Sequence, residues 1–165
     1  MVEFERERIL PYTPAQIWKV LADFENHRVW NPYVRLKAFQ GDPMTLRYEL
    51  RMDPQKPKFV EVAATLLAAY PERLLTIDVR PSFLLKFEDS YALSPVAGGT
   101  KLHHSISCRG LLVGLRLPGV RKSFETMLNA TDAILTTHLE RKYRELPPRG
   151  STPSKSRPAR RGGRR

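Results

Sequence analysis

Histidine is the side chain best suited to acid–base chemistry near neutral pH, and this chain has two in succession, His103 and His104. They lie in an alternating segment that predicts a β-strand, in which neighbouring side chains point to opposite faces. The two rings therefore cannot act together on one ligand or one metal ion. His104 shares its face with Leu102 and Ile106, which predicts that His104 points into the protein and His103 away from it. The competing interpretation is that His104 is simply a hydrogen-bonded or solvated histidine.

A carboxylate and a phenol on the preceding predicted strand extend this pattern. Asp89 and Tyr91 share one face with Leu93. If this face is turned inward, His104, Asp89 and Tyr91 converge as an acid–base set. We take these three residues as the candidate catalytic residues.

Other catalytic and metal-binding motifs are absent from the sequence. It has no HExxH zinc motif, no nucleophile elbow and no phosphate-binding loop. Its one cysteine, Cys108, excludes a disulfide framework and a Cys-rich zinc site. We therefore expect no metal ion and no cofactor.

Apolar side chains recur at regular spacing in three segments and are candidates for the lining of a ligand pocket. Such a pocket needs apolar walls for affinity and a few polar groups for orientation. The alternative is that these residues are simply core. The candidate ligand-binding residues are Tyr48, Leu50, Met52, Leu102, Ile106, Phe124, Met127, Leu128 and Leu135.

The elements that position these residues follow from local signals. Thr13 and Gln16 form a capping box around Pro14, which predicts a short helix over about 14–22. A second short helical segment is expected to end at Trp30, before Asn31-Pro32. Period-two alternation with short turns predicts an antiparallel meander. The expected strands are residues 2–10, 34–38, 46–52, 59–70, 75–79, 86–93 and 100–108.

The last element is a long amphipathic helix over about residues 119–144, with an apolar face at i, i+3/i+4 spacing. We assign Arg121, Glu125, Asp132 and Glu140 to its polar face. The apolar face must cover the strands before it. The order predicts an α+β fold in which a curved antiparallel sheet of six to seven strands wraps the C-terminal helix, with two short helices after the first strand.

Several short motifs follow one another in a fixed order along residues 2–146: Thr13–Trp18, Trp30–Val34, Gly98–His104, Gly110–Leu115 and Phe124–Asn129. Together they resemble the SRPBCC or START-like helix-grip superfamily, in its polyketide cyclase/dehydrase and lipid-transport branch. The resemblance implies a deep, mainly apolar cavity between sheet and helix. This branch often has a glutamate in the final strand where Ile106 stands, so no role of that carboxylate carries over.

The end of the chain differs in composition from the rest. Residues 147–165 contain seven Lys or Arg and no acidic residue, which leaves +4 of the net charge of +11 on residues 1–146. The segment has no large apolar residue, so we expect a domain over 1–146 followed by a disordered basic tail. The tail is a candidate for weak contact with an anionic partner, a nucleic acid or a membrane surface.

The function predicted from these features is the binding of a hydrophobic or amphipathic, lipid-like or polyketide-like small molecule. The alternative is a cyclase or dehydratase that uses acid–base residues in the same cavity. A third hypothesis is a nucleic-acid accessory protein that acts through the tail. There is no transmembrane stretch and no signal-peptide pattern, so we expect a cytoplasmic protein. The oligomeric state stays open.

Overall fold

The computed structural model describes residues 1–39, 41–51, 53–111 and 118–144. Met52, most of the segment that links the last strand to the last helix, and the basic tail lie outside the described residues. The elements are β1 (Val2–Leu10), α1 (Pro14–Leu21), η1 (Phe24–Asn26), α2 (His27–Trp30), β2 (Val34–Phe39), β3 (Asp42–Leu50), β4 (Val60–Tyr70), β5 (Leu74–Ser82), β6 (Leu85–Val96), β7 (Gly99–Arg109) and α4 (Pro118–Arg144).

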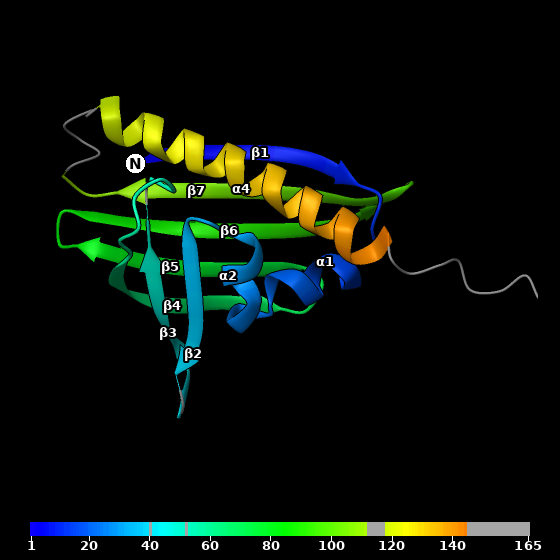
Figure 1. Cartoon of the computed structure of the whole chain (residues 1–165), viewed down its shortest axis with the longest axis horizontal. Coiled ribbons are helices and arrows are strands. Elements are labelled where there is room, and N and C mark those ends of the chain that lie inside the picture. The colour runs from blue at the N-terminus through cyan, green and yellow to red at the C-terminus, as the bar shows by residue number, and fades with distance from the viewer. Residues whose placement is uncertain (40, 52, 112–117, 145–165) are drawn as a thin grey trace, which may run out of the picture.

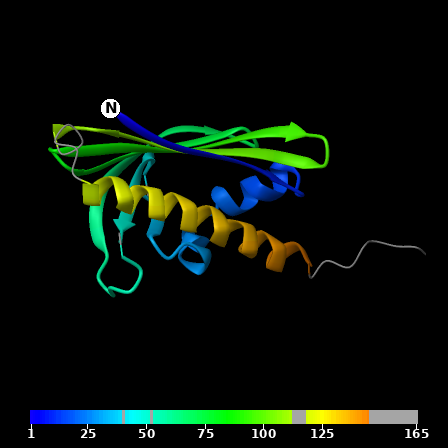
Figure 2. The same ribbon diagram turned by 90° about the horizontal axis from the view of Figure 1, so that it is seen from above.

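The described strands form one seven-stranded antiparallel sheet in the order β1-β7-β6-β5-β4-β3-β2 (Figure 1). β1 pairs with β7 although the other strands lie between them in the chain. The helices α1, α2 and α4 all lie on one side of the sheet, and β2 and β3 bend round toward that side (Figure 2). The predicted α+β helix-grip architecture is confirmed.

Local capping explains where the first helix begins. The Thr13 hydroxyl accepts a hydrogen bond from the Gln16 backbone N–H at 3.3 Å, and the Gln16 side chain accepts one from the Thr13 N–H at 2.9 Å. This is the predicted capping box, which satisfies two otherwise free donors. After α2, the Asn31 side chain accepts from the backbone N–H groups of Tyr33 at 2.9 Å and Val34 at 3.1 Å. It therefore ends the helix and starts β2.

The Gly-Gly-Thr turn before β7 has a steric cause. Gly99 has φ +151°, and a Cβ at this position would overlap the carbonyl oxygen of Leu10 at the end of β1. Only glycine lets the two strands approach this closely. The next residue, Thr100, donates a hydrogen bond from its hydroxyl to the Tyr12 carbonyl oxygen at 2.7 Å. The turn thus joins β7 to the segment that leads from β1 into α1.

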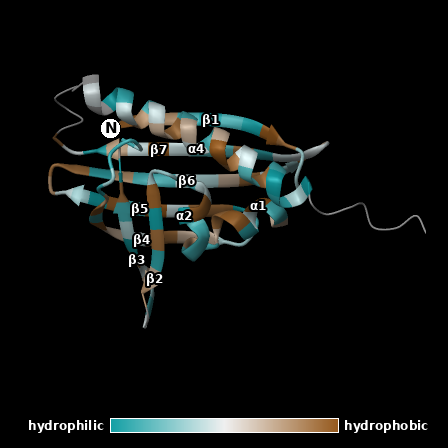
Figure 3. Ribbon diagram, in the orientation of Figure 1, coloured by the Kyte–Doolittle hydropathy of each residue, from teal (hydrophilic) through white to brown (hydrophobic). Residues whose placement is uncertain are grey.

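The core lies between the concave face of the sheet and α4. Hydrophobic and hydrophilic residues alternate along the strands (Figure 3), so each strand turns one set of side chains toward the helices. Phe124 of α4 packs between Phe4 and Phe87, with ring centroids 6.0 and 5.2 Å away. Tyr48 of β3 meets Phe87 edge to face at 6.4 Å. Aromatic packing therefore fixes α4 against β1 and β6, and Phe87 in turn contacts β3 through Tyr48.

Candidate functional site

A histidine held between two carboxylates lies in the interior of the protein. His104 Nε2 lies 2.9 Å from Asp89 Oδ1, and His104 Nδ1 lies 2.6 Å from Asp132 Oδ1. All three residues are buried. The cluster spans two strands and the long helix, so it joins the sheet to α4.

The strand register brings the predicted catalytic residues together. Tyr91 on β6 is the cross-strand neighbour of His104 on β7. Asp89 precedes Tyr91 by two residues and faces the same side of the sheet. The Tyr91 ring stacks on the His104 ring with centroids 4.0 Å apart and an interplanar angle of 18°. His104 is turned inward and buried, whereas His103 contacts Glu5 at 3.1 Å at the surface. This is the predicted orientation of the two histidines.

The assignment of Asp132 to the polar face of the last helix was wrong. Its side chain is only 1% exposed and contacts His104. A signal was present in the sequence, because Asp132 follows Leu128 by four residues and precedes Leu135 by three, which places it on the apolar stripe of the helix. The charge of Asp132 suggested a surface residue, but its position on this stripe places it inside. Asp132 is a functional candidate that was not predicted from the sequence.

The two carboxylates determine the charge of His104. Burial lowers its pKa, but the hydrogen bonds and charges of Asp132 and Asp89 outweigh burial and raise it to about 9. At neutral pH the ring is therefore an imidazolium that donates from both nitrogens. Neither ring nitrogen is left to contact a ligand. His104 can hold or relay a proton between carboxylates, but it cannot directly bind a ligand in this arrangement.

Asp89 is the member of the cluster that has accessible surface. Its side chain is 10% exposed, against 2% for His104 and 1% for Asp132. The exposed part belongs to a side chain on the inward face of β6, between the buried residues Phe87 and Tyr91. Asp89 is therefore the carboxylate best placed to meet a ligand in the interior.

Several buried polar atoms of β3 and α2 lack a hydrogen-bond partner among the described residues. They are Tyr48 Oη, Trp30 Nε1 and His27 Nδ1. His27 Nε2 lies 2.7 Å from the Leu21 carbonyl oxygen, to which it donates, so Nδ1 of the neutral ring is an acceptor. Burial lowers the pKa of His27, which favours this neutral form. The interior thus has both donors and acceptors available.

The buried phenols stay protonated. Burial raises the pKa of Tyr48 well above its ordinary value, and the charge of Asp89 raises it further. The same two causes, in the same order, act on the pKa of Tyr91. Both hydroxyls therefore act as hydrogen-bonding groups at neutral pH and not as bases.

The predicted ligand-binding residues, apart from Met52, face the interior. Tyr48, Leu50, Leu102, Ile106, Phe124, Met127, Leu128 and Leu135 are all buried. They come from β3, β7 and α4 and belong to one hydrophobic cluster. Phe87 and Trp30 lie in the same cluster but were not among the candidates, because the sequence marks them only as apolar.

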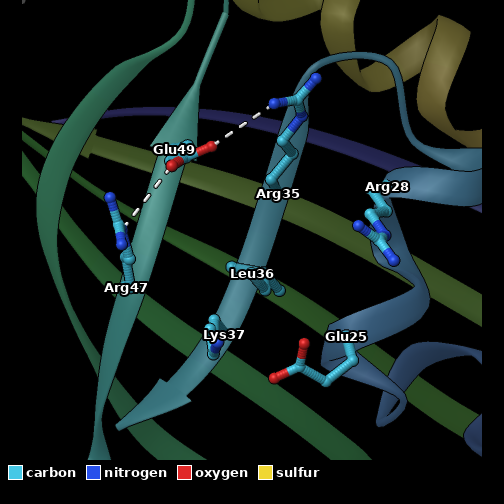
Figure 4. A pocket seen from close by; sticks show the side chains of 7 residues that line it. All are labelled: Glu25, Arg28, Arg35, Leu36, Lys37, Arg47 and Glu49. Carbon is cyan, nitrogen blue, oxygen red and sulfur yellow. Dashed lines mark ion pairs between the residues drawn. The ribbon is translucent and has the colours of Figure 1, made fainter.

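A pocket of about 370 Å³ has a different lining from the predicted cavity. It lies beside the edge strand β2, between η1–α2 and β3, and is lined by Glu25, Arg28, Arg35, Leu36, Lys37, Arg47 and Glu49 (Figure 4). Glu49 is shared by Arg35 at 3.8 Å and Arg47 at 3.6 Å. A smaller pocket of about 310 Å³ lies on the outer face of α4, around Thr137 and Arg141. Neither contains Tyr48, Leu50 or Phe124.

Cys108 and possible metal-binding groups are the remaining candidates for chemistry. Cys108 is buried, and burial raises the pKa of its thiol to about 12, so it is an inert core residue. Within residues 1–39, 41–51, 53–111 and 118–144, no group of three His, Cys, Asp or Glu side chains is arranged to hold a metal ion. The Asp89–His104–Asp132 cluster is joined by two hydrogen bonds.

Comparison with known structures agrees with this architecture. The chain is similar to TTHA0849 from Thermus thermophilus, with a TM-score of 0.67, 15% identity, and coverage of 86% of this chain and 99% of that one. A START superfamily protein from Mycobacterium smegmatis gives a TM-score of 0.67 and 16% identity, with coverage of 85% and 98%. The di-domain ARO/CYC StfQ of the steffimycin biosynthetic pathway gives a TM-score of 0.68 and 13% identity, with coverage of 86% of this chain and 52% of StfQ. At these identities the similarity establishes the fold.

The family follows from the sequence comparison. The model of the family described as polyketide cyclase / dehydrase and lipid transport matches residues 1–140. The chain belongs to this family, and the predicted SRPBCC or START-like resemblance is confirmed. A search of curated protein sequences finds no match. None of the described helices combines the length and the apolar character needed to cross a membrane.

Proposed function

We propose that this protein binds a hydrophobic or amphipathic, lipid-like or polyketide-like small molecule between the concave face of the sheet and α4. The apolar part of the ligand contacts the buried side chains of β3, β7 and α4. Its polar part lies beside Asp89 and Tyr48. The family supports this proposal, because its description covers both lipid transport and cyclases that act on polyketides.

The single observation that carries the proposal is the set of unpartnered polar atoms in an apolar interior. Tyr48 Oη, Trp30 Nε1 and His27 Nδ1 are buried without a partner among the described residues. Leaving a buried donor or acceptor unsatisfied costs about 1–3 kcal/mol. Native proteins satisfy nearly all such groups, so these three exceptions support a polar ligand group or ordered water in this interior.

The test is to look for a ligand directly. Native mass spectrometry of the freshly purified full chain should show a bound small molecule that is lost on unfolding. Titration with Prodan, a neutral apolar fluorophore, should show saturable binding that an apolar ligand displaces. Arg28→Ala is the control, because Arg28 lines the charged outer pocket and its loss should leave Prodan binding unchanged. If native mass spectrometry shows only the mass of the chain without a bound molecule, and Prodan shows no saturable binding, the proposal is refuted.

A second candidate function is acid–base catalysis in the same interior, as in a cyclase or dehydratase. The observation that favours it is the continuous hydrogen-bonded series Asp132–His104–Asp89, whose Asp89 end is the most accessible. Asp89 is then the group that exchanges a proton with the substrate. His104 and Asp132 act through Asp89 as positioning residues, and Tyr91 packs on the ring of His104.

Comparison of His104→Gln with the parent chain separates the two functions, provided that ligand affinity and turnover are measured independently. Loss of a proton-relaying group from an enzyme should lower turnover by about 10²–10⁴-fold while ligand affinity persists. In a carrier, the same variant should leave ligand affinity nearly unchanged, because both ring nitrogens of His104 are bonded to carboxylates and neither contacts the ligand, and there is no turnover to lose. Unchanged turnover in the variant would refute the catalytic role.

A further inference from the structure

The charge of the buried cluster is unbalanced. Asp89 and Asp132 contribute two carboxylates, and His104 contributes one imidazolium between them. The cluster therefore has a net charge of −1 in the interior of the protein. An uncompensated charge in an apolar environment is unfavourable in free energy. The site therefore selects among entering groups by the sign of their charge.

The other charged groups near the cluster do not neutralise it from within the core. Arg6 and Arg8 of β1 are the cross-strand neighbours of His104 and Leu102, but both are only partly buried, and the guanidinium of Arg6 donates to the Asn129 side chain. At this solvent boundary the charges of both arginines are screened by water. The other buried histidine, His27, is neutral at neutral pH because burial lowers its pKa. Asp78 is buried too, but on the opposite face of the sheet.

Tyr48 supplies a second, independent observation. Its ring is fully buried on the inward face of β3, and its hydroxyl has no hydrogen-bond partner among the described residues. Its ring meets that of Phe87 with centroids 6.4 Å apart, and Phe87 precedes Asp89 by two residues on the same inward face of β6, so Tyr48 and Asp89 face the same region of the interior. A neutral phenol can accept one hydrogen bond and donate another. Asp89 and Tyr48 together therefore present acceptor oxygens to a ligand.

We propose that the ligand presents an uncharged or cationic hydrogen-bond donor, a hydroxyl or an ammonium group, to Asp89 and Tyr48, and that the site discriminates against carboxylates and other anions. This inference rests on the proposed function and adds the chemical class of the polar end. A charged donor on a carboxylate makes a stronger hydrogen bond than a neutral pair. An anion would instead meet a like charge in a medium of low dielectric constant. Long-chain amines and alcohols should bind, and fatty acids should not.

The experiment uses three probes of equal chain length that differ only in the head group: decylammonium, decanol and decanoate. Each is titrated into the full chain at neutral pH, below its micelle concentration, by calorimetry and by displacement of Prodan. We expect decylammonium to bind about 10- to 100-fold more tightly than decanoate, with decanol between them, as one charge-assisted hydrogen bond predicts.

Matched substitutions test whether Asp89 causes the preference. Asp89→Asn should abolish most of the difference between decylammonium and decanoate. Asp78→Asn makes the same chemical change at a buried carboxylate that is paired with Arg80 and Lys86 on the other face of the sheet, and it should keep the preference. If Asp89→Asn does not fold, Tyr48→Phe replaces it. That variant removes only an unpartnered hydroxyl. It should weaken the binding of decanol about 2- to 10-fold and leave the binding of decanoate unchanged.

The outcomes separate the two proposals. Equal binding of the three probes, or tightest binding of decanoate, would overturn the charge preference and leave small-molecule binding standing. A preference that survives Asp89→Asn, or that Asp78→Asn removes equally, would overturn the role of Asp89. Failure of all three probes to bind or to displace Prodan would overturn the proposed function and this inference with it.

Discussion

His104 of β7 and Asp132 of α4 lie 28 residues apart in the chain, and their side chains meet at 2.6 Å. This contact connects the last strand of the sheet to the helix that packs across it. It also leaves His104 with both nitrogens engaged, since Asp89 takes the other at 2.9 Å. The helix therefore contributes a charged group to the interior and not only an apolar surface.

The stability of the protein should fall as the pH rises from about 6.5 to about 9. The folded-state pKa of His104 is raised from 6.5 to about 9, so its contribution is fully present below pH 6.5 and is lost as the pH rises through 9. A shift of this size corresponds to roughly 3 kcal/mol of unfolding free energy. Urea unfolding at a series of pH values measures it. His104→Gln should remove this slope, and a flat profile for the parent chain would contradict the assigned charge.

Asp132→Ala should destabilise the fold by about 1–3 kcal/mol, because it leaves the buried Nδ1–H of His104 without its hydrogen-bond partner. Glu140→Ala is the matched control, since Glu140 lies exposed on the same helix. It should change stability by less than about 0.5 kcal/mol. Thermal and urea unfolding of both variants provide the comparison. Equal effects would show that Asp132 is a surface residue, as its charge suggested.

Phe124→Ala should lower the free energy of unfolding by about 3–5 kcal/mol, because the ring packs between Phe4 and Phe87 in the core. A smaller loss would indicate that the ring borders a void, as expected for a ligand cavity that reaches it. Phe83→Ala is the control, because Phe83 is 96% exposed and should be neutral. Urea unfolding of the chain with and without Prodan distinguishes packing from a cavity wall.

Deletion of residues 147–165 should leave stability and small-molecule binding nearly unchanged. The segment contains no large apolar residue that could dock on the folded part of the chain. We expect a change in unfolding free energy below about 1 kcal/mol. The deletion should, however, weaken any binding to anionic vesicles or nucleic acid, and this loss should be greater at low salt. A larger loss of stability would mean that the tail docks on the domain.

The architecture was accessible from the sequence because its signals are local. The capping box of Thr13 and Gln16, the alternation of inward and outward side chains, and the spacing of the last helix each depend on residues within a few positions of one another. Such signals place His104 inward and His103 outward, as the structure has them. Strand boundaries also depend on pairing with the neighbouring strand, and β3 begins at Asp42, four residues before the expected start.

The composition of the site depended on contacts between layers. Asp132 lies on the apolar stripe of its helix, but only the packing of α4 across the curved sheet shows that a buried histidine meets it there. The same holds for Tyr48, whose hydroxyl is unpartnered among the described residues because of what surrounds it and not because of its neighbours in sequence. Periodicity determines which face of an element a side chain occupies. The curvature of the sheet and the crossing of the helix determine which distant side chain, and which charge, it meets.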